Sequence, residues 1–260
     1  MRIGMYQFPV TGNIENNKEK IVTAINDAHK KKVKVLIFPE CALTGYPPRN
    51  IENSSKVNFN ELEDAYVLLQ RLCDNYEMYV VAGTITKVNN VFYNSAILFS
   101  PHGDRIIYNK KALWGWDRDN FSCGRENGIV QIEDWKIGIR ICFEVRFPEF
   151  FRELYKARTD LNVIVFYDVS DVDDVSRYEM IKAHILTRAV ENVTYTASVN
   201  ATEPFQTAPT MLCDKSGRLL CEAERNKEQL LVYDLEKREN DFGENGRKEI
   251  SDWLLLKEAL

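Results

Sequence analysis

The stretch KIGIRICFEVRFPEFFREL, residues 136–154, leads from a strand-like run into a helix-like run, with Cys142 between them. Residues 128–142 have the pattern of a hairpin, and residues 147–157 are predicted to form a helix that starts near a proline. An apolar run, predicted to be a strand, follows at 161–168. A strand, a helix and a second strand in this order are typical of an α/β protein.

The same alternation continues on both sides of this unit. Further helices are predicted over 14–32, 60–76 and 176–192. Further strands are predicted over 2–8, 33–38, 79–86, 90–100, 105–110, 193–201, 210–224 and 229–235. Hairpins among these strands favour mixed sheets, and the pattern allows two sheets packed face to face with helices outside. Because no long linker or break in composition divides the chain, we expect one domain over residues 1–260.

Three stretches have no strong periodic pattern. Residues 41–50 contain a glycine and two prolines and are predicted to form a loop. Residues 111–128 are rich in Trp, Asp, Gly and Asn and are also predicted to be a loop. Residues 236–260 are charged, and we expect them to lie across the surface.

Composition excludes several classes of protein. The 260 residues include 34 basic and 39 acidic side chains, a net charge of −5, which argues against broad attraction to nucleic acid. Apolar residues make up 45% of the chain, enough for a folded core. No apolar run reaches about 18 residues, so we expect no membrane span. The N-terminus lacks the apolar region of a secretory signal, so we expect a cytoplasmic protein.

Common metal and nucleotide motifs are absent from the sequence. It contains no GxGxxG, no P-loop and no GxSxG elbow. The six cysteines form no CxxC pair, and only three histidines are present, His29, His102 and His184. Neither a structural zinc site nor a Ser-His-Asp mechanism is therefore supported.

Three polar residues stand at predicted strand ends. Cys142 precedes a helix start, whose backbone N–H groups can polarise a carbonyl oxygen. Glu40 follows the strand 33–38, where partial burial raises a carboxyl pKa enough for a base. Lys110 ends the strand 105–110, and a buried lysine there would stabilise an oxyanion. Taken singly, each has a plainer interpretation: a core cysteine, a solvated loop carboxylate and a surface lysine.

The order and context of these residues resemble the nitrilase superfamily of carbon–nitrogen hydrolases. IFPECALTGYPP at 37–48 is similar to the first motif of that family, YNKKAL at 108–113 to the second, and IGIRICFEVRFPEFFREL at 137–154 to the third. TRAVENVTYTASVNA at 187–201 resembles its later helix-to-strand passage, and TMLCDKSGRLL at 210–220 its final hairpin. The resemblance thus extends over nearly the whole chain.

The resemblance implies both a fold and functional roles. Glu40 would be the general base, Lys110 the catalytic lysine, Cys142 the nucleophile and Tyr46 a pocket residue. The implied fold is an α/β four-layer α-β-β-α sandwich with two mixed β-sheets. The family usually forms homodimers or larger assemblies, so a homo-oligomer is expected, with the C-terminal segment crossing to a partner subunit. The implied chemistry requires no metal and no organic cofactor.

The sequence departs from the family pattern around the expected pocket. Asp117 stands where many members have a second glutamate, and the turn FSCG has Cys123 where proline is usual. Ala112 replaces the usual histidine after the lysine, and Tyr167 replaces a proline downstream of the nucleophile. Substrates of better-known members are therefore an unsafe guide to this chain.

An aromatic wall and three carboxylates are predicted to surround the substrate. The residues assigned to this pocket are Tyr46, Trp116, Asp117, Phe143, Glu144, Tyr167 and Asp168, with Trp114 as a further aromatic residue. The carboxylates of Asp117, Glu144 and Asp168 would make the mouth acidic and favour a neutral or cationic substrate. In a plainer interpretation, several of these carboxylates face water or cap helices.

The predicted reaction is hydrolysis of a non-peptide C–N bond in a small amide. Cys142 would attack the carbonyl while Glu40 takes the thiol proton and passes it to the leaving ammonia. Lys110 and the Phe143 backbone N–H would hold the oxyanion. Water activated by Glu40 would then hydrolyse the thioester. N-carbamoyl amide hydrolysis and nitrile hydrolysis are alternatives within the family.

Two other classes of function stay open. TGYPP at 44–48 resembles a string in the glutamine-hydrolysing domain of NAD synthetases, which suggests a glutaminase-like subunit that supplies ammonia to a partner. The departures at Asp117 and Tyr167 suggest a non-catalytic binding protein on the same fold. Retention of Glu40, Lys110 and Cys142 argues against that second class.

Overall fold

The computed structural model describes residues 1–257 and contains two six-stranded sheets. The first consists, in spatial order, of β14 (Gln229–Asp234), β1 (Arg2–Gln7), β2 (Val35–Ile37), β3 (Tyr79–Val88), β4 (Val91–Phe99) and β5 (Ile106–Asn109). The second consists of β13 (Leu219–Glu222), β12 (Met211–Cys213), β10 (Tyr195–Asn200), β8 (Leu161–Phe166), β7 (Trp135–Ile141) and β6 (Ile129–Ile132). Parallel and antiparallel pairs occur in both, so the prediction of mixed sheets is confirmed.

The alternation of side chains along the strands explains why the two sheets pack face to face. Successive residues of a strand point to opposite faces. Ile3 and Met5 of β1 therefore join Ile137 and Ile139 of β7 in one apolar core between the sheets. Leu36 of β2 points the other way, into the core on the outer face of the first sheet.

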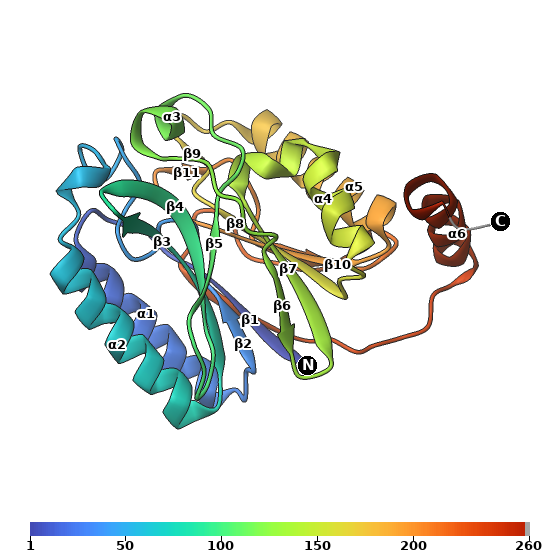
Figure 1. The fold of residues 1–260 in the computed structure, drawn as a ribbon, viewed down its shortest axis with the longest axis horizontal. Coiled ribbons are helices and arrows are strands. Elements are labelled where there is room, and N and C mark those ends of the chain that lie inside the picture. The colour runs from blue at the N-terminus through green and yellow to red at the C-terminus, as the bar shows by residue number, and fades with distance from the viewer. Residues whose placement is uncertain (258–260) are drawn as a thin grey trace.

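Two pairs of helices cover the outer faces of the sandwich. They are α1 (Ile14–Lys30) and α2 (Phe59–Tyr76) on the first sheet, and α4 (Pro148–Lys156) and α5 (Val175–Asn192) on the second. Their buried stripes include Ile21 and Leu69 on one side and Phe151 and Ile185 on the other. Figure 1 shows the two pairs on opposite sides of the sheets. The layers confirm the predicted four-layer α-β-β-α sandwich.

The structure corrects the sequence prediction in two stretches. The predicted loop 111–128 contains a short helix, α3 (Trp116–Asn120). The predicted surface segment contains α6 (Phe242–Leu256), and its last residues, 258–260, lie outside the described part of the chain. The buried residues of α6 are Glu244, Ser251 and Asp252, so its docking face is polar and no apolar periodicity marked it.

The smaller elements lie in the connections. A two-stranded sheet pairs β9 (Val169–Ser170) with β11 (Phe205–Gln206), and 3-10 helices cover Ser54–Lys56 and Cys142–Arg146. In Figure 1, α6 stands at one end of the molecule after an extended connection from β14. Within residues 1–257 no helix has both the length and the apolar character that a bilayer crossing needs. That a single domain spans residues 1–260 stays a prediction.

Candidate active site

Strand ends from both sheets meet at one edge of the sandwich. Glu40 follows β2, Lys110 follows β5 directly, and Cys142 follows β7 directly. The Glu40 backbone N–H donates to the carbonyl of Phe166 at 3.2 Å, which ties the chain after β2 to the end of β8 in the other sheet. The three polar residues singled out in the sequence are therefore brought to the same place by the packing of the sheets.

Lys110 lies between two carboxylates below the surface. Its Nζ is 2.8 Å from Glu40 Oε1 and 2.8 Å from Asp117 Oδ2. The Lys110 side chain is 2% exposed and that of Glu40 is fully buried. The Tyr46 hydroxyl donates to the other oxygen of Asp117 at 2.8 Å. Asp117 thus reaches the site, from the short helix α3.

Both oxygens of the Glu40 carboxylate are held in place. The Asn94 side-chain amide donates to Oε1 at 2.6 Å, and the Tyr167 backbone N–H donates to Oε2 at 2.7 Å. The Asn94 carbonyl also accepts from the Lys110 backbone N–H at 2.8 Å. Asn94, which the sequence did not single out, therefore orients the carboxylate and fixes the start of the lysine-bearing segment.

Burial and charge shift the pKa values of all three groups. Burial raises the pKa of Glu40, and the Lys110 ammonium opposes this only in part. Burial by itself lowers the pKa of Lys110, but Glu40 and Asp117 outweigh it and hold that pKa well above its usual value. Burial and then the charge of Glu40 raise the pKa of the Cys142 thiol. Cys142 is therefore a thiol at neutral pH and needs a base to become a nucleophile.

The backbone at Cys142 turns sharply from strand to helix. Its φ is 46°, in the left-handed region that a residue with a side chain seldom adopts. The 3-10 helix Cys142–Arg146 follows at once, and Pro148 then opens α4. This turn lifts the cysteine out of the strand and leaves the backbone N–H of Phe143 at the start of a helical turn, as an oxyanion donor requires.

A cavity of 400 Å³ opens above these groups. Six residues predicted to bind substrate line it together with Lys110 and Cys142: Tyr46, Trp116, Asp117, Phe143, Tyr167 and Asp168. The rings of Tyr46 and Tyr167 stack with their centroids 5.1 Å apart. Trp114 lines the same cavity and is largely exposed. The aromatic wall expected from the sequence is therefore present in the structure.

The carboxylates at the mouth of the cavity, which include Asp174, are matched by cations, so the mouth is not simply acidic as the sequence suggested. Asp117 is paired with Lys110. Asp168 accepts from the Arg177 guanidinium at 2.9 and 3.0 Å. Arg49 also lines the cavity, and its guanidinium is 2.9 Å from Asp171. Arg49 and Arg177 were missed because an arginine in a loop or on a polar helix face is ordinary in a sequence.

Glu144 does not line the cavity, contrary to the prediction. It is fully buried beneath the turn. Its carboxylate accepts from the backbone N–H groups of Ile141 and Lys111, each at 2.7 Å. It also accepts from the Tyr108 hydroxyl at 2.8 and 2.9 Å. Glu144 therefore ties the end of β7 to the end of β5 and positions Cys142 relative to Lys110.

Replacing Glu144 tests this positioning role. Each carboxylate oxygen accepts from a backbone N–H, so in Glu144→Gln the amide nitrogen would face the N–H of Ile141 or of Lys111 in either orientation. We expect the free energy of unfolding to fall by about 2–3 kcal/mol, as for a lost charged hydrogen bond in the interior. Chemical denaturation of Glu144→Gln beside the exposed control Glu149→Gln measures it. Equal stability of the two variants would contradict the role.

In residues 1–257, no group of three or more His, Cys, Asp or Glu side chains is arranged to hold a metal ion. The groups gathered at this edge are instead a thiol, two carboxylates and an ammonium. Together with the backbone N–H of Phe143, they form a set suited to nucleophilic attack on a carbonyl with proton transfer.

Comparisons with known proteins match the chain to a hydrolase family and to several similar proteins. The carbon–nitrogen hydrolase family matches residues 2–239. A glutamine-dependent NAD(+) synthetase from Aquifex aeolicus is 26% identical over 93% of this chain, which spans 42% of that protein. An (R)-stereoselective amidase from Pseudomonas sp is 26% identical over 85% of this chain and 78% of its own length. The NitN amidase structure from Nesterenkonia sp. AN1 has a TM-score of 0.80 at 22% identity, covering 91% of this chain and 93% of that one.

The fold and the family match together define a carbon–nitrogen hydrolase. The chain belongs to the carbon–nitrogen hydrolase family, whose match extends over most of its length. The family, the fold class and the enzyme class predicted from the sequence are confirmed.

Proposed function

We propose that this enzyme hydrolyses a small amide through a thioester on Cys142 and releases ammonia. The observation that carries the proposal is the pairing of a fully buried Glu40 with Lys110 at the strand edge where Cys142 begins the turn. A thiol with a raised pKa is a poor nucleophile unless a base stands beside it. Glu40, whose pKa burial raises, is suited to take and return a proton near neutral pH.

In the proposed reaction, Glu40 carries each proton that is taken up or released. Cys142 Sγ attacks the amide carbon, its proton moves to Glu40, and the oxyanion is held by Lys110 Nζ and the backbone N–H of Phe143. Collapse breaks the C–N bond, and Glu40 delivers the proton to the nitrogen that leaves as ammonia. Water then gives a proton to Glu40 and attacks the thioester. The acid leaves, and the proton returns to Cys142.

Named relatives support an amide as the substrate. One is the Pseudomonas amidase described above, and another is a 2-oxoglutaramate amidase from Bacillus subtilis, 24% identical over 86% of this chain. A Nesterenkonia amidase with the same fold is described with the acetamide moiety of fluoroacetamide covalently added at its active site cysteine. N-carbamoyl hydrolysis and nitrile hydrolysis are the alternatives for this chain.

A substrate panel tests the proposal. Ammonia release would be measured on aliphatic amides, ureido acids and nitriles at one enzyme concentration. We expect turnover of at least one amide and slower or no release from the other two classes. Turnover restricted to nitriles or ureido acids would overturn the amide assignment while leaving the thiol mechanism in place.

The two arginines at the cavity favour a second candidate, an amide that also carries a carboxylate. Arg177 and Arg49 both line the cavity, paired with Asp168 and Asp171 respectively. We expect Arg177→Met to raise KM for glutamine-like amides severalfold and to leave KM for neutral amides unchanged. An equal effect on both kinds of amide would contradict carboxylate recognition.

We also propose that the enzyme is a cytoplasmic homo-oligomer. Ile250, Trp253 and Leu254 form an exposed apolar stripe on α6, at the spacing of one helix face. A second copy of the chain would cover this stripe. Light scattering of the purified protein would give a mass of two or more chains if it does, and a monomer at micromolar concentration would contradict it.

A further inference from the structure

A second cavity lies beside the second sheet, at the ends of its strands opposite to Cys142. Its volume is 210 Å³, and residues from four connections line it. Thr159 and Asp160, which line it, precede β8, whereas Tyr167 and Asp168 of the catalytic cavity follow β8. The six residues of β8 span about 20 Å. A ligand here is therefore distinct from an amide that reacts at Cys142.

Most of the charged residues that line the cavity are cations. Its charged residues are Arg158, Lys215, Lys237, Arg238 and Lys248, with Asp160 as the carboxylate among the lining residues. Two further carboxylates lie behind this lining. Asp252 is 2.6 Å from Arg158 and 2.5 Å from Lys248, and buried Glu244 holds Arg238. These two carboxylates contact the cations but do not line the cavity themselves.

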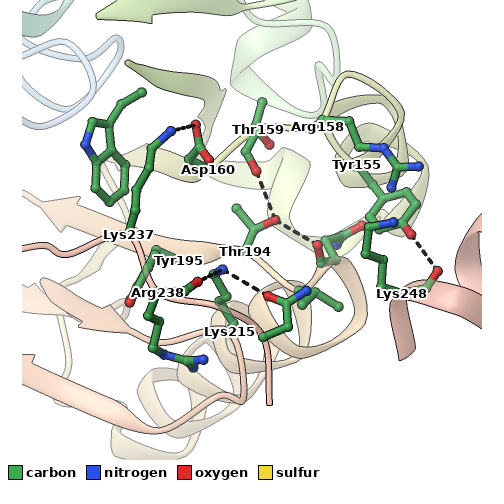
Figure 2. A pocket seen from close by; sticks show the side chains of 14 residues that line it. Tyr155, Arg158, Thr159, Asp160, Thr194, Tyr195, Lys215, Lys237, Arg238 and Lys248 are labelled. Atoms are coloured by element: carbon green, nitrogen blue, oxygen red, sulfur yellow. Dashed lines mark hydrogen bonds and ion pairs between the residues drawn. The ribbon is translucent and has the colours of Figure 1, made fainter. Parts of the chain in front are cut away.

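Two more carboxylates stand farther away. Asp214 is 3.8 Å from Arg238, and the exposed Asp134 is 3.9 Å from Lys237. Neither lines the cavity. Lys237 also lies 3.2 Å from Asp160, and Figure 2 shows this pair at one side of the cavity. The Lys237 Nζ is 5.4 Å from the centroid of the Trp135 ring.

Lys215 is the cation that these carboxylates do not pair. Its Nζ donates to the Arg238 carbonyl at 3.2 Å and to Asn240 Oδ1 at 3.0 Å, both neutral oxygens. Among residues 1–257 no carboxylate oxygen lies within 4.0 Å of it. Burial and the charge of Arg238 lower the pKa of Lys215, and the charges of Glu244 and Asp160 oppose this only in part. Figure 2 shows its ammonium group pointing toward the middle of the cavity near Thr194. A half-buried ammonium with no carboxylate in direct contact is a position where a bound anion would be stabilised.

The ends of α4 and α5 do not explain the cations. Both helices end at this cavity, and the carbonyl groups of a last helical turn, which have no partner within the helix, attract positive charge. Those carbonyls are taken by other side chains: Lys136 donates to Ala157, Arg152 to Glu191 and Arg247 to Val190. Lys136, Arg152 and Arg247 do not line the cavity. The ammonium of Lys215, which donates to neutral oxygens, is therefore not engaged by these helix ends.

We propose that this cavity binds a small oxyanion, such as the phosphate group of a compact molecule, with Lys215 as its counter-ion. The volume is below the roughly 300–1,000 Å³ of sites for drug-sized ligands, so the ligand must be small. Lys237 and Arg238 come from the connection after β14, Lys248 from α6 and Lys215 from the β12–β13 turn. The anion would therefore fasten the C-terminal segment to the second sheet.

Calorimetric titration with inorganic phosphate tests the site, with chloride at equal ionic strength as the reference. We expect saturable binding to the full-length enzyme and at least about tenfold weaker binding to Lys215→Met. The variant lacks the charged hydrogen bond that Lys215 would donate to the phosphate. The matched control is Lys30→Met, an exposed lysine paired with Asp27 on α1, which should bind as the wild type does.

The remaining outcomes decide against the site. No binding beyond that of chloride overturns it, and so does equal binding by Lys215→Met, which would place phosphate elsewhere, for example at Arg49 and Arg177. If Lys215→Met is unfolded by circular dichroism, Lys237→Met is held to the same tenfold criterion. Amide hydrolysis by Lys215→Met at the wild-type rate shows that a loss of phosphate binding is not a loss of the fold.

Discussion

Cys142→Ala is expected to release no measurable ammonia from any amide that the wild type hydrolyses. The methyl side chain cannot form the thioester, and neither Glu40 nor Lys110 is placed to act as a nucleophile in its stead. Loss of the nucleophile in a coupled catalytic set lowers kcat by at least about 10⁴-fold. A coupled ammonia assay with single-turnover amounts of enzyme measures this loss.

The matched control for this variant is Cys221→Ala, since Cys221 is also half-buried and lies away from the site. It should retain the wild-type rate. Mass spectrometry after incubation with a chloroacetamide should find the adduct on Cys142 before Cys221. Residual ammonia release within a hundredfold of wild type by Cys142→Ala would contradict the thioester mechanism, because the amide would then be hydrolysed without Cys142.

Glu40→Gln is expected to lower kcat/KM by about 10²–10⁴-fold, the range for loss of a general base. The substitution preserves the size of the side chain but removes both the base and the charge that pairs with Lys110. In the wild type, activity should fall as pH drops through the pKa of Glu40, because protonation removes the base. Burial raises that pKa, so the acid limb should lie above the value of about 4.3 for an ordinary glutamate.

The pH profile separates this base role from a structural one. In Glu40→Gln the acid limb should vanish, and the small residual rate should be flat over the same range. Glu149→Gln, on the exposed start of α4, should keep both the rate and the limb. A Glu40→Gln variant that retains the wild-type limb would show that another group titrates, and the proton transfer would have to be reassigned.

Much of this architecture follows from local patterns in the sequence. Strand alternation at residues such as Ile3 and Met5, and the helical stripe through Ile21, reflect burial on one face, which leaves a periodic trace. The three catalytic candidates were found because family motifs fix their order. Periodicity alone could not have distinguished Cys142 from a core cysteine.

The parts that sequence analysis missed depend on contacts between distant residues. A glutamate two positions after the nucleophile has the same sequence whether it faces the substrate or, like Glu144, accepts backbone N–H groups from two strands. Arg177 has no distinguishing pattern in the sequence, and only the fold brings its guanidinium into contact with Asp168. The docking face of α6 is built of Glu244 and Asp252, so it looked like a solvated segment.

The hydrogen bonds of Glu144 couple the distance between Cys142 and Lys110 to the spacing of the two sheets. Lys111 N–H follows a strand of one sheet and Ile141 N–H ends a strand of the other, yet both point to the same carboxylate. Any breathing that parts the sheets at this edge must break both bonds together, so the two amides should exchange with solvent through one common opening. Cys142 and Lys110 therefore move apart only when the two sheets separate at Glu144. Small substitutions in the apolar core between the sheets should for this reason change the rate of the reaction at Cys142.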